Sequence, residues 1–178
     1  PIIEKVRNEK DIALLQFSKE LENVEVELQS LKVSENEFSE AFDLIDPEMK
    51  RVIEFCSNNV KRFHENQMPK KKWLIELHQG VFAGEMSNSI ESVAIYVPMG
   101  KGSFPSVAMM ASIPAVVAGV DNPIILTPPK KNGSVDCATL VAASIAGITN
   151  VFKCGGAQAV AAAAYGTESI PKCLKIVG

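Results

Sequence analysis

Apolar positions in the first half of the chain recur with the period of a helix. Between residues 9 and 23 they fall roughly on one helical face among charged residues, at Ile12, Leu15, Phe17 and Leu21. Ser34 followed by Glu37 has the spacing of a capping box, and Asp46-Pro47 offers an N-cap and a pre-set first turn. The pattern therefore predicts three helices before residue 68.

The apolar pattern then changes to that of strands. Residues 73–86 alternate in part and break at Gln79-Gly80, which favours a hairpin. Continuous apolar runs begin near Val93, Ile124 and Val151, and each is followed by turn residues and an alanine-rich segment. Strands without alternation are typical of parallel sheets covered by helices on both faces. The second half thus predicts three βα units and a last strand over residues 174–177.

The amino-acid composition also changes along the chain, close to the point where the first βα unit is predicted to begin. Residues 1–91 contain 12 basic and 18 acidic side chains, whereas residues 92–178 contain 6 and 3. We therefore predict an α/β protein with two parts. Residues 1–91 form a helical segment with a small β-hairpin, and residues 92–178 form an incomplete Rossmann-like parallel sheet flanked by helices.

Charge and hydropathy exclude several classes of function. A net charge of −3 and an isoelectric point near 5.5 argue against a nucleic-acid partner. No apolar run reaches the roughly 18 residues that span a bilayer, and the chain opens without a basic-then-apolar leader, so we expect no membrane partner and a cytoplasmic location. Neither the four cysteines nor the two histidines have the spacing of metal ligands.

Ligands of open α/β sheets bind at the carboxyl ends of the strands, which directs attention to two glycine-containing loops. The loop at residues 97–105 contains Gly100 and precedes a helix, but it lacks the third glycine of the dinucleotide fingerprint, so nucleotide binding and a purely structural turn both stay open. Gly155-Gly156 opens a second helix, whose Gln158 could bind a planar ligand or cap the helix.

Catalytic groups are harder to find at this edge. Cys154 precedes the two glycines, and a buried thiol is the favoured interpretation over a nucleophile, because no histidine lies nearby in sequence. Lys130 and Lys131 follow two prolines and could touch a phosphate or simply face solvent. The second half holds only three acids. The residues alone therefore predict a binding edge without a catalytic set or a metal site.

Several segments of the second half resemble the histidinol dehydrogenase family. They are YVP at 96–98, FPSV at 104–107, IPA at 113–115, AGV at 118–120, GGAQA at 155–159, YGTESIPK at 165–172 and KIVG at 175–178. In the first half, DPE at 46–48 and RFHENQ at 62–67 are similar to the family's N-terminal helices. The resemblance covers essentially the whole chain.

The resemblance implies an activity and a coenzyme. The family oxidises L-histidinol to L-histidine through L-histidinaldehyde in two NAD-dependent steps, at the end of histidine biosynthesis, as a zinc-dependent homodimer. Tyr96 and Gln158 match family positions that contact NAD, and Gly100, Gly155 and Gly156 match the loops along which the coenzyme lies. The family's acid–base residues and zinc ligands occur later in longer members, so we expect no catalytic or metal residues here and an isolated chain with little or no activity.

Two other functions stay open at this stage. The chain could be a non-catalytic α/β module that binds a nucleotide or assembles with a partner. It could also be an aldehyde-dehydrogenase-like enzyme that uses Cys154, which would require that thiol to be reactive.

Overall fold

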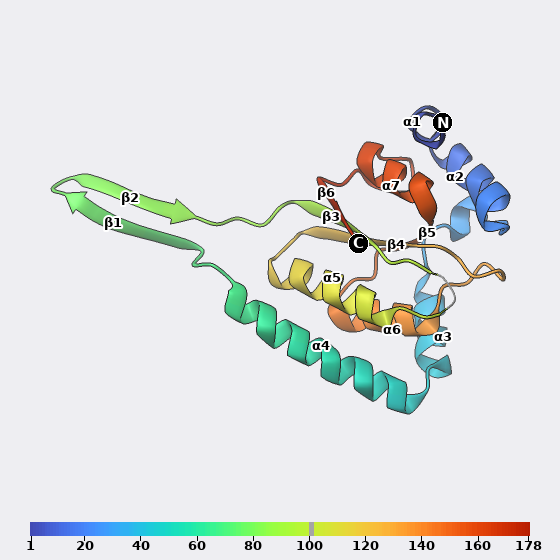
Figure 1. Cartoon of the computed structure of the whole chain (residues 1–178), viewed down its shortest axis with the longest axis horizontal. Coiled ribbons are helices and arrows are strands. Elements are labelled where there is room, and N and C mark those ends of the chain that lie inside the picture. The colour runs from blue at the N-terminus through green and yellow to red at the C-terminus, as the bar shows by residue number, and fades with distance from the viewer. Residues whose placement is uncertain (100–101) are drawn as a thin grey trace.

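A four-stranded parallel sheet forms the centre of the molecule (Figure 1). The computed structural model describes residues 1–99 and 102–178. The strand order is β5-β4-β3-β6, and every pair of neighbours is parallel. The strands are β3 (Ser92–Tyr96), β4 (Asn122–Thr127), β5 (Val151–Lys153) and β6 (Lys175–Val177). The predicted α/β architecture and all four predicted strands are confirmed.

Helices cover both faces of this sheet. Successive strand residues point to opposite sides, and because these residues are apolar on both sides, both faces must be buried. Val93, Ile95 and Ile125 belong to the core beneath one set of helices, whereas Ala94 and Ile124 belong to the other. The first face carries α3 (Glu35–Leu44), α4 (Pro47–Gln67), α5 (Pro105–Val117) and α6 (Cys137–Ala146). The second carries α1 (Ile2–Glu9), α2 (Asp11–Phe17) and α7 (Gly156–Tyr165). Residues from both sides of position 91 therefore build each core.

The N-terminal helix differs from its prediction. The predicted helix over residues 9–23 is confirmed for residues 11–22, but its start is wrong, because Lys10 adopts a positive φ of 51° and separates α1 from α2. The chain then continues as a π-helical turn, η1 (Ser18–Glu22), and ends in left-handed Asn23. By contrast, both predicted caps are confirmed: Ser34 and Glu37 form a capping box on α3, and Asp46 caps α4.

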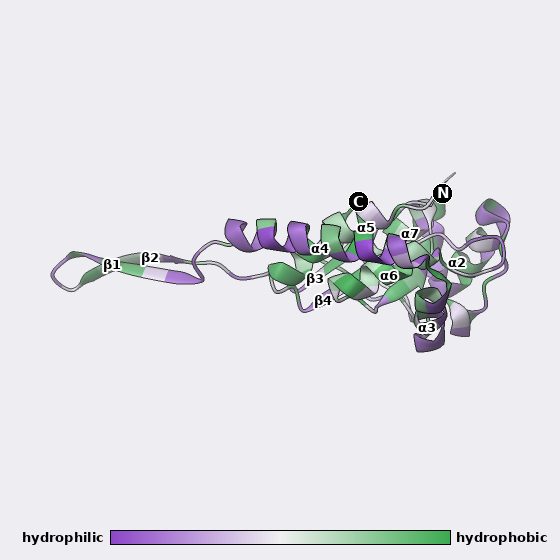
Figure 2. Cartoon of the chain, turned by 90° about the horizontal axis from the view of Figure 1, so that it is seen from below, coloured by the Kyte–Doolittle hydropathy of each residue, from purple (hydrophilic) through white to green (hydrophobic). Residues whose placement is uncertain are grey.

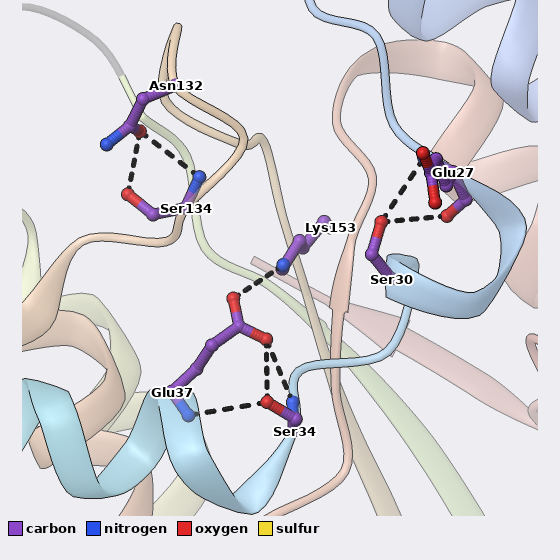
Figure 3. Close-up of polar contacts among 7 residues, drawn as sticks. All are labelled: Glu27, Ser30, Ser34, Glu37, Asn132, Ser134 and Lys153. Atoms are coloured by element: carbon purple, nitrogen blue, oxygen red, sulfur yellow. Dashed lines mark hydrogen bonds and ion pairs between the residues drawn. The ribbon is translucent and has the colours of Figure 1, made fainter.

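The segment around η2 (Leu28–Ser30) protects the outer edge of β5. The Val33 amide donates to the Val151 carbonyl at 2.9 Å, and the Lys153 amide donates to the Leu31 carbonyl at 2.8 Å. Figure 3 shows the side-chain contact that fastens this edge, an ion pair at 2.5 Å between Lys153 and Glu37. Lys153 is only 5% exposed, so the pair is largely shielded from solvent. The N-terminal segment thereby covers an otherwise open sheet edge.

A β-hairpin projects from the body as an arm (Figure 1). It consists of β1 (Lys72–His78) and β2 (Val81–Met86), paired antiparallel, and it turns at Gln79-Gly80 as predicted. Every residue of both strands is exposed. None of the helices in the described part of the chain is long and apolar enough to cross a membrane.

Candidate functional site at the carboxyl edge

The carboxyl ends of β3, β4 and β5 meet at one edge of the sheet, where α5, α6 and α7 begin. Asp136 joins two of the loops there, because its carboxylate accepts from the Ser103 hydroxyl and pairs with Lys130 at 3.2 Å. It also caps α6 through the Thr139 amide at 3.0 Å. Burial works to raise the pKa of Asp136, but these three contacts outweigh it and hold the pKa below its usual value. Lys130 is thus engaged within the protein.

Tyr96 and Gln158 lie together at this edge although they come from different βα units. Tyr96 ends β3, and its hydroxyl oxygen accepts a hydrogen bond from the Gly156 amide at 3.1 Å. Gln158 lies two residues further along α7 and is 2% exposed. Its Oε1 has no hydrogen-bond partner among the described residues. A buried acceptor without a donor is unfavourable, so a ligand that donates to Gln158 would satisfy it.

The two glycines of this turn are required by close approach. Gly156 has a φ of +60°, and a Cβ at this position would lie 2.7 Å from Gln158 Oε1. A Cβ on Gly155 would lie 2.4 Å from Pro128 Cγ. The turn can therefore carry no side chain at either position without displacing a residue of the site.

Glu22 is a site residue that the sequence analysis missed. Its Oε1 accepts from the Gly155 amide at 2.9 Å and lies 3.4 Å from Gln158 Nε2. Desolvation raises the pKa of Glu22, and hydrogen bonds from Ser18 and Gly155 only partly oppose this effect. Glu22 lies 133 positions before Gly155, and no motif links them. Only the packing of η1 against the start of α7 brings the two together.

An open pocket of about 380 Å³ lies at this turn. Its described lining comprises Ile2, Leu21, Glu22, Met99, Pro128, Pro129, Gly156, Ala157 and Gln158. Apolar walls with a few polar groups are typical of sites for small molecules and cofactors. A larger pocket of about 480 Å³ lies at the base of the arm, between Met68 and Gly119, away from the carboxyl edge. We place the candidate site at the smaller pocket because Gln158 and Glu22 converge there.

Cys154 lies beside this pocket but is unsuited to nucleophilic catalysis. It is 3% exposed, which confirms the interpretation of a buried thiol. Burial raises the pKa of the thiol, and the negative charges of Glu22 and Asp11 raise it further. Because the thiolate is the nucleophile, these surroundings oppose an enzyme that uses Cys154.

Gly100 lies outside the described residues. Within residues 1–99 and 102–178, no group of three or more histidine, cysteine, aspartate or glutamate side chains could hold a metal ion. The described part of the chain therefore does not fit the zinc ion that the resemblance implies.

Comparison with known proteins supports the resemblance over the whole chain. The family model of histidinol dehydrogenase matches residues 1–178. A protein of Rhizobium meliloti (strain 1021), named histidinol dehydrogenase homolog, is 55% identical over 178 residues, which are 100% of this chain and 39% of that protein. The histidinol dehydrogenase of Synechocystis sp. is 44% identical over 177 residues, which are 99% of this chain and 40% of that protein.

The fold also matches that of a solved structure. A crystal structure of histidinol dehydrogenase from Elizabethkingia anophelis superposes with a TM-score of 0.94 at 35% identity, covering 99% of this chain and 40% of that one. The chain thus spans about 40% of the length of these relatives. Its sequence and its fold both show that the chain belongs to the histidinol dehydrogenase family.

Proposed function

We propose that the complete protein carrying this sequence is an NAD-dependent dehydrogenase of histidine biosynthesis in the cytoplasm, and that this chain supplies part of its NAD site. The reaction would oxidise L-histidinol to L-histidine through L-histidinaldehyde, with two NAD consumed. One observation carries the proposal: Tyr96 and Gln158 meet at the Gly156 turn on the carboxyl edge of the sheet. That edge is where open α/β sheets bind their coenzymes.

The residues at this edge suit part of a dinucleotide. The orphaned Oε1 of Gln158 can accept from a carboxamide, an amino group or a ribose hydroxyl. Gly155 and Gly156 keep the turn free of side chains, so a ligand can approach the backbone. When bound, NAD accepts a hydride from the alcohol and then from the aldehyde.

The remaining chemistry would belong to the portion of the relatives that this chain does not cover. The described residues provide no metal ligands, so we assign zinc and the acid–base groups to that portion. We therefore expect weak or no turnover from residues 1–178 alone.

The coenzyme assignment can be tested with Gln158→Leu in the complete protein. Leucine keeps the volume of the side chain but cannot accept a hydrogen bond, so we expect the KM for NAD to rise about tenfold while the KM for L-histidinol changes little. Gln67→Leu, at the exposed end of α4, is the matched control and should leave both constants unchanged. Equal NAD dependence in the two variants would contradict the assignment. NAD binding without turnover of any alcohol would favour a non-catalytic module.

A second candidate function has one observation in its favour. The relative named histidinol dehydrogenase homolog is 55% identical to this chain, and the Synechocystis histidinol dehydrogenase is 44% identical. The chain is thus more similar to a protein named as a homolog than to one named as the enzyme itself. This higher identity would also fit an NAD-dependent enzyme that acts on another small alcohol. Initial rates of the complete protein with L-histidinol and with a panel of other small polar alcohols distinguish the two. A kcat/KM for L-histidinol below that for another alcohol would favour the second.

We also propose that the complete protein is a homodimer in which the arm packs on the partner subunit. The arm exposes large apolar side chains on both strands, among them Leu74, Ile75, Leu77 and Phe82, each at least 50% exposed. Figure 2 shows apolar stretches along this otherwise isolated hairpin. A two-stranded hairpin is marginally stable in water, and large exposed apolar patches mark interaction sites.

Phe82→Lys tests this interface. The added charge would be buried against the partner, so we expect the dimer dissociation constant to rise at least tenfold in analytical ultracentrifugation of the complete protein. Gln79→Lys adds the same charge at the exposed turn of the arm and should leave the dimer intact. A wild-type monomer, or equal dissociation of both variants, would contradict this use of the arm.

A further inference from the structure

The N-terminus of α7 already holds an anion that belongs to the chain. Helix N-termini attract negative groups, because their first amides lack partners within the helix and point toward the ligand. Here Glu22 Oε1 accepts at 2.9 Å from the amide of Gly155, the N-cap residue that immediately precedes α7. Its second oxygen accepts from the Ser18 hydroxyl at 3.1 Å, which fixes the carboxylate from the other side. The next amide, of Gly156, is taken by Tyr96.

The same carboxylate faces the candidate coenzyme pocket. Among the described residues that line the pocket, Glu22 is the one charged side chain. Pro128, Pro129 and Met99 supply apolar walls that suit a flat ring. Gln158 adds a buried acceptor oxygen without a donor. The pocket is therefore complementary to a group that donates hydrogen bonds, and a phosphate placed there would meet both an occupied amide and a like charge.

We propose that Glu22 closes the N-terminus of α7 to phosphate, so that this pocket receives a nucleoside part of the coenzyme and not its diphosphate. The inference rests on the proposed use of NAD. It makes Glu22 a specificity-determining residue that fixes which part of the dinucleotide lies against Gln158. A ribose hydroxyl, a carboxamide or an exocyclic amino group can each donate to Gln158 Oε1.

Inorganic pyrophosphate is a direct probe of this closure. Its binding to the complete protein can be followed through the amide resonance of Gly155, in wild type and in two variants. Glu22→Gln removes the charge but keeps the shape, and Glu22→Ala vacates the amide. We expect no saturable shift in wild type and at least tenfold tighter pyrophosphate binding in each variant, with the alanine variant the tighter. Glu20→Gln removes an exposed charge from the same turn and should behave as wild type.

Three results would overturn the proposal. The first is a saturable pyrophosphate shift at Gly155 in wild type, and the second is no gain in either Glu22 variant. The third concerns adenosine and nicotinamide riboside, the two nucleosides of the coenzyme. If neither of them shifted the side-chain amide resonance of Gln158, the pocket would not be a nucleoside site. If the alanine variant fails to fold, the near-isosteric glutamine variant still decides the pyrophosphate comparison. An absence of NAD-dependent turnover would count against the proposed function and leave the pyrophosphate result standing.

Discussion

Replacing Glu37 with leucine is expected to lower the free energy of unfolding by about 3 kcal/mol, because it leaves the ammonium group of Lys153 buried without its counter-charge. The Lys153 side chain is 5% exposed, whereas the Glu37 side chain is 25% exposed. That partial exposure places the expected loss at the lower end of the range for broken buried pairs. Urea denaturation at pH 7 measures it.

Two further variants separate the ion pair from the helix cap. Glu37 also belongs to the capping box of α3, so Ser34→Ala measures the cap alone, with an expected loss of about 1 kcal/mol. Combining Glu37→Leu with Lys153→Met replaces the pair with apolar groups and should recover most of the lost stability. If Glu37→Leu lowered the free energy of unfolding no more than Ser34→Ala does, the buried ion pair would contribute nothing to stability beyond the helix cap.

The same pair gives a pH dependence with a definite sign. Burial works to raise the pKa of Glu37, but the hydrogen bond from Lys153, the bond from the Ser34 amide and the Lys153 charge outweigh it and lower the pKa below its usual 4.5. A carboxyl group with a lowered pKa stabilises the fold above its ordinary pKa and loses that contribution as the pH falls through the folded-state value. The stability gap between wild type and Glu37→Leu should therefore narrow below pH 4.5.

Gly156→Ala is expected to have the largest effect on the coenzyme site. The new Cβ would lie 2.7 Å from Gln158 Oε1, so the glutamine side chain must move, and the φ of +60° disfavours alanine by about 1–2 kcal/mol. We expect NAD affinity of the complete protein, measured by calorimetry, to fall more than tenfold. If NAD binding depends on Gln158, this loss of affinity should exceed the loss caused by Gly155→Ala, whose new Cβ would meet Pro128.

Gly147→Ala provides the matched control for backbone strain. Gly147 has a φ of +91° at the end of α6, and an added Cβ would meet only Val116 methyl groups, at 3.9 Å. This variant should lose a similar amount of stability and bind NAD as wild type does. Equal losses of NAD affinity in the two variants would mean that general destabilisation, and not Gln158, explains the effect.

The features that the sequence predicted are those encoded within short segments. Helix caps such as Ser34–Glu37 depend on residues three positions apart, and the hairpin depends on its Gln79-Gly80 turn. The βα units follow from continuous apolar strands and small-residue helices, which favour a covered parallel sheet. The proximity of Tyr96 and Gln158 was inferable because Tyr96 ends β3, Gln158 follows β5, and both strands end at the same edge of the sheet.

The features that the sequence did not predict depend on contacts between distant segments. Glu22 reaches Gly155 across 133 positions, and Lys153 meets Glu37 only because residues 31–33 pair along β5. The break at Lys10 also escaped the periodicity, because a single residue with positive φ leaves the apolar spacing on either side unchanged. Composition marked the passage from the arm into β3, although residues from both sides of position 91 contribute to each core.

A crystal structure of the complete protein bound to NAD tests the central claim most directly. We expect coenzyme density at the carboxyl edge, with one of the coenzyme's nucleoside groups within hydrogen-bond distance of Gln158 and beside the Tyr96–Gly156 contact. Density for NAD elsewhere, for example in the pocket at the base of the arm between Met68 and Gly119, with Gln158 Oε1 left without a donor, would contradict it.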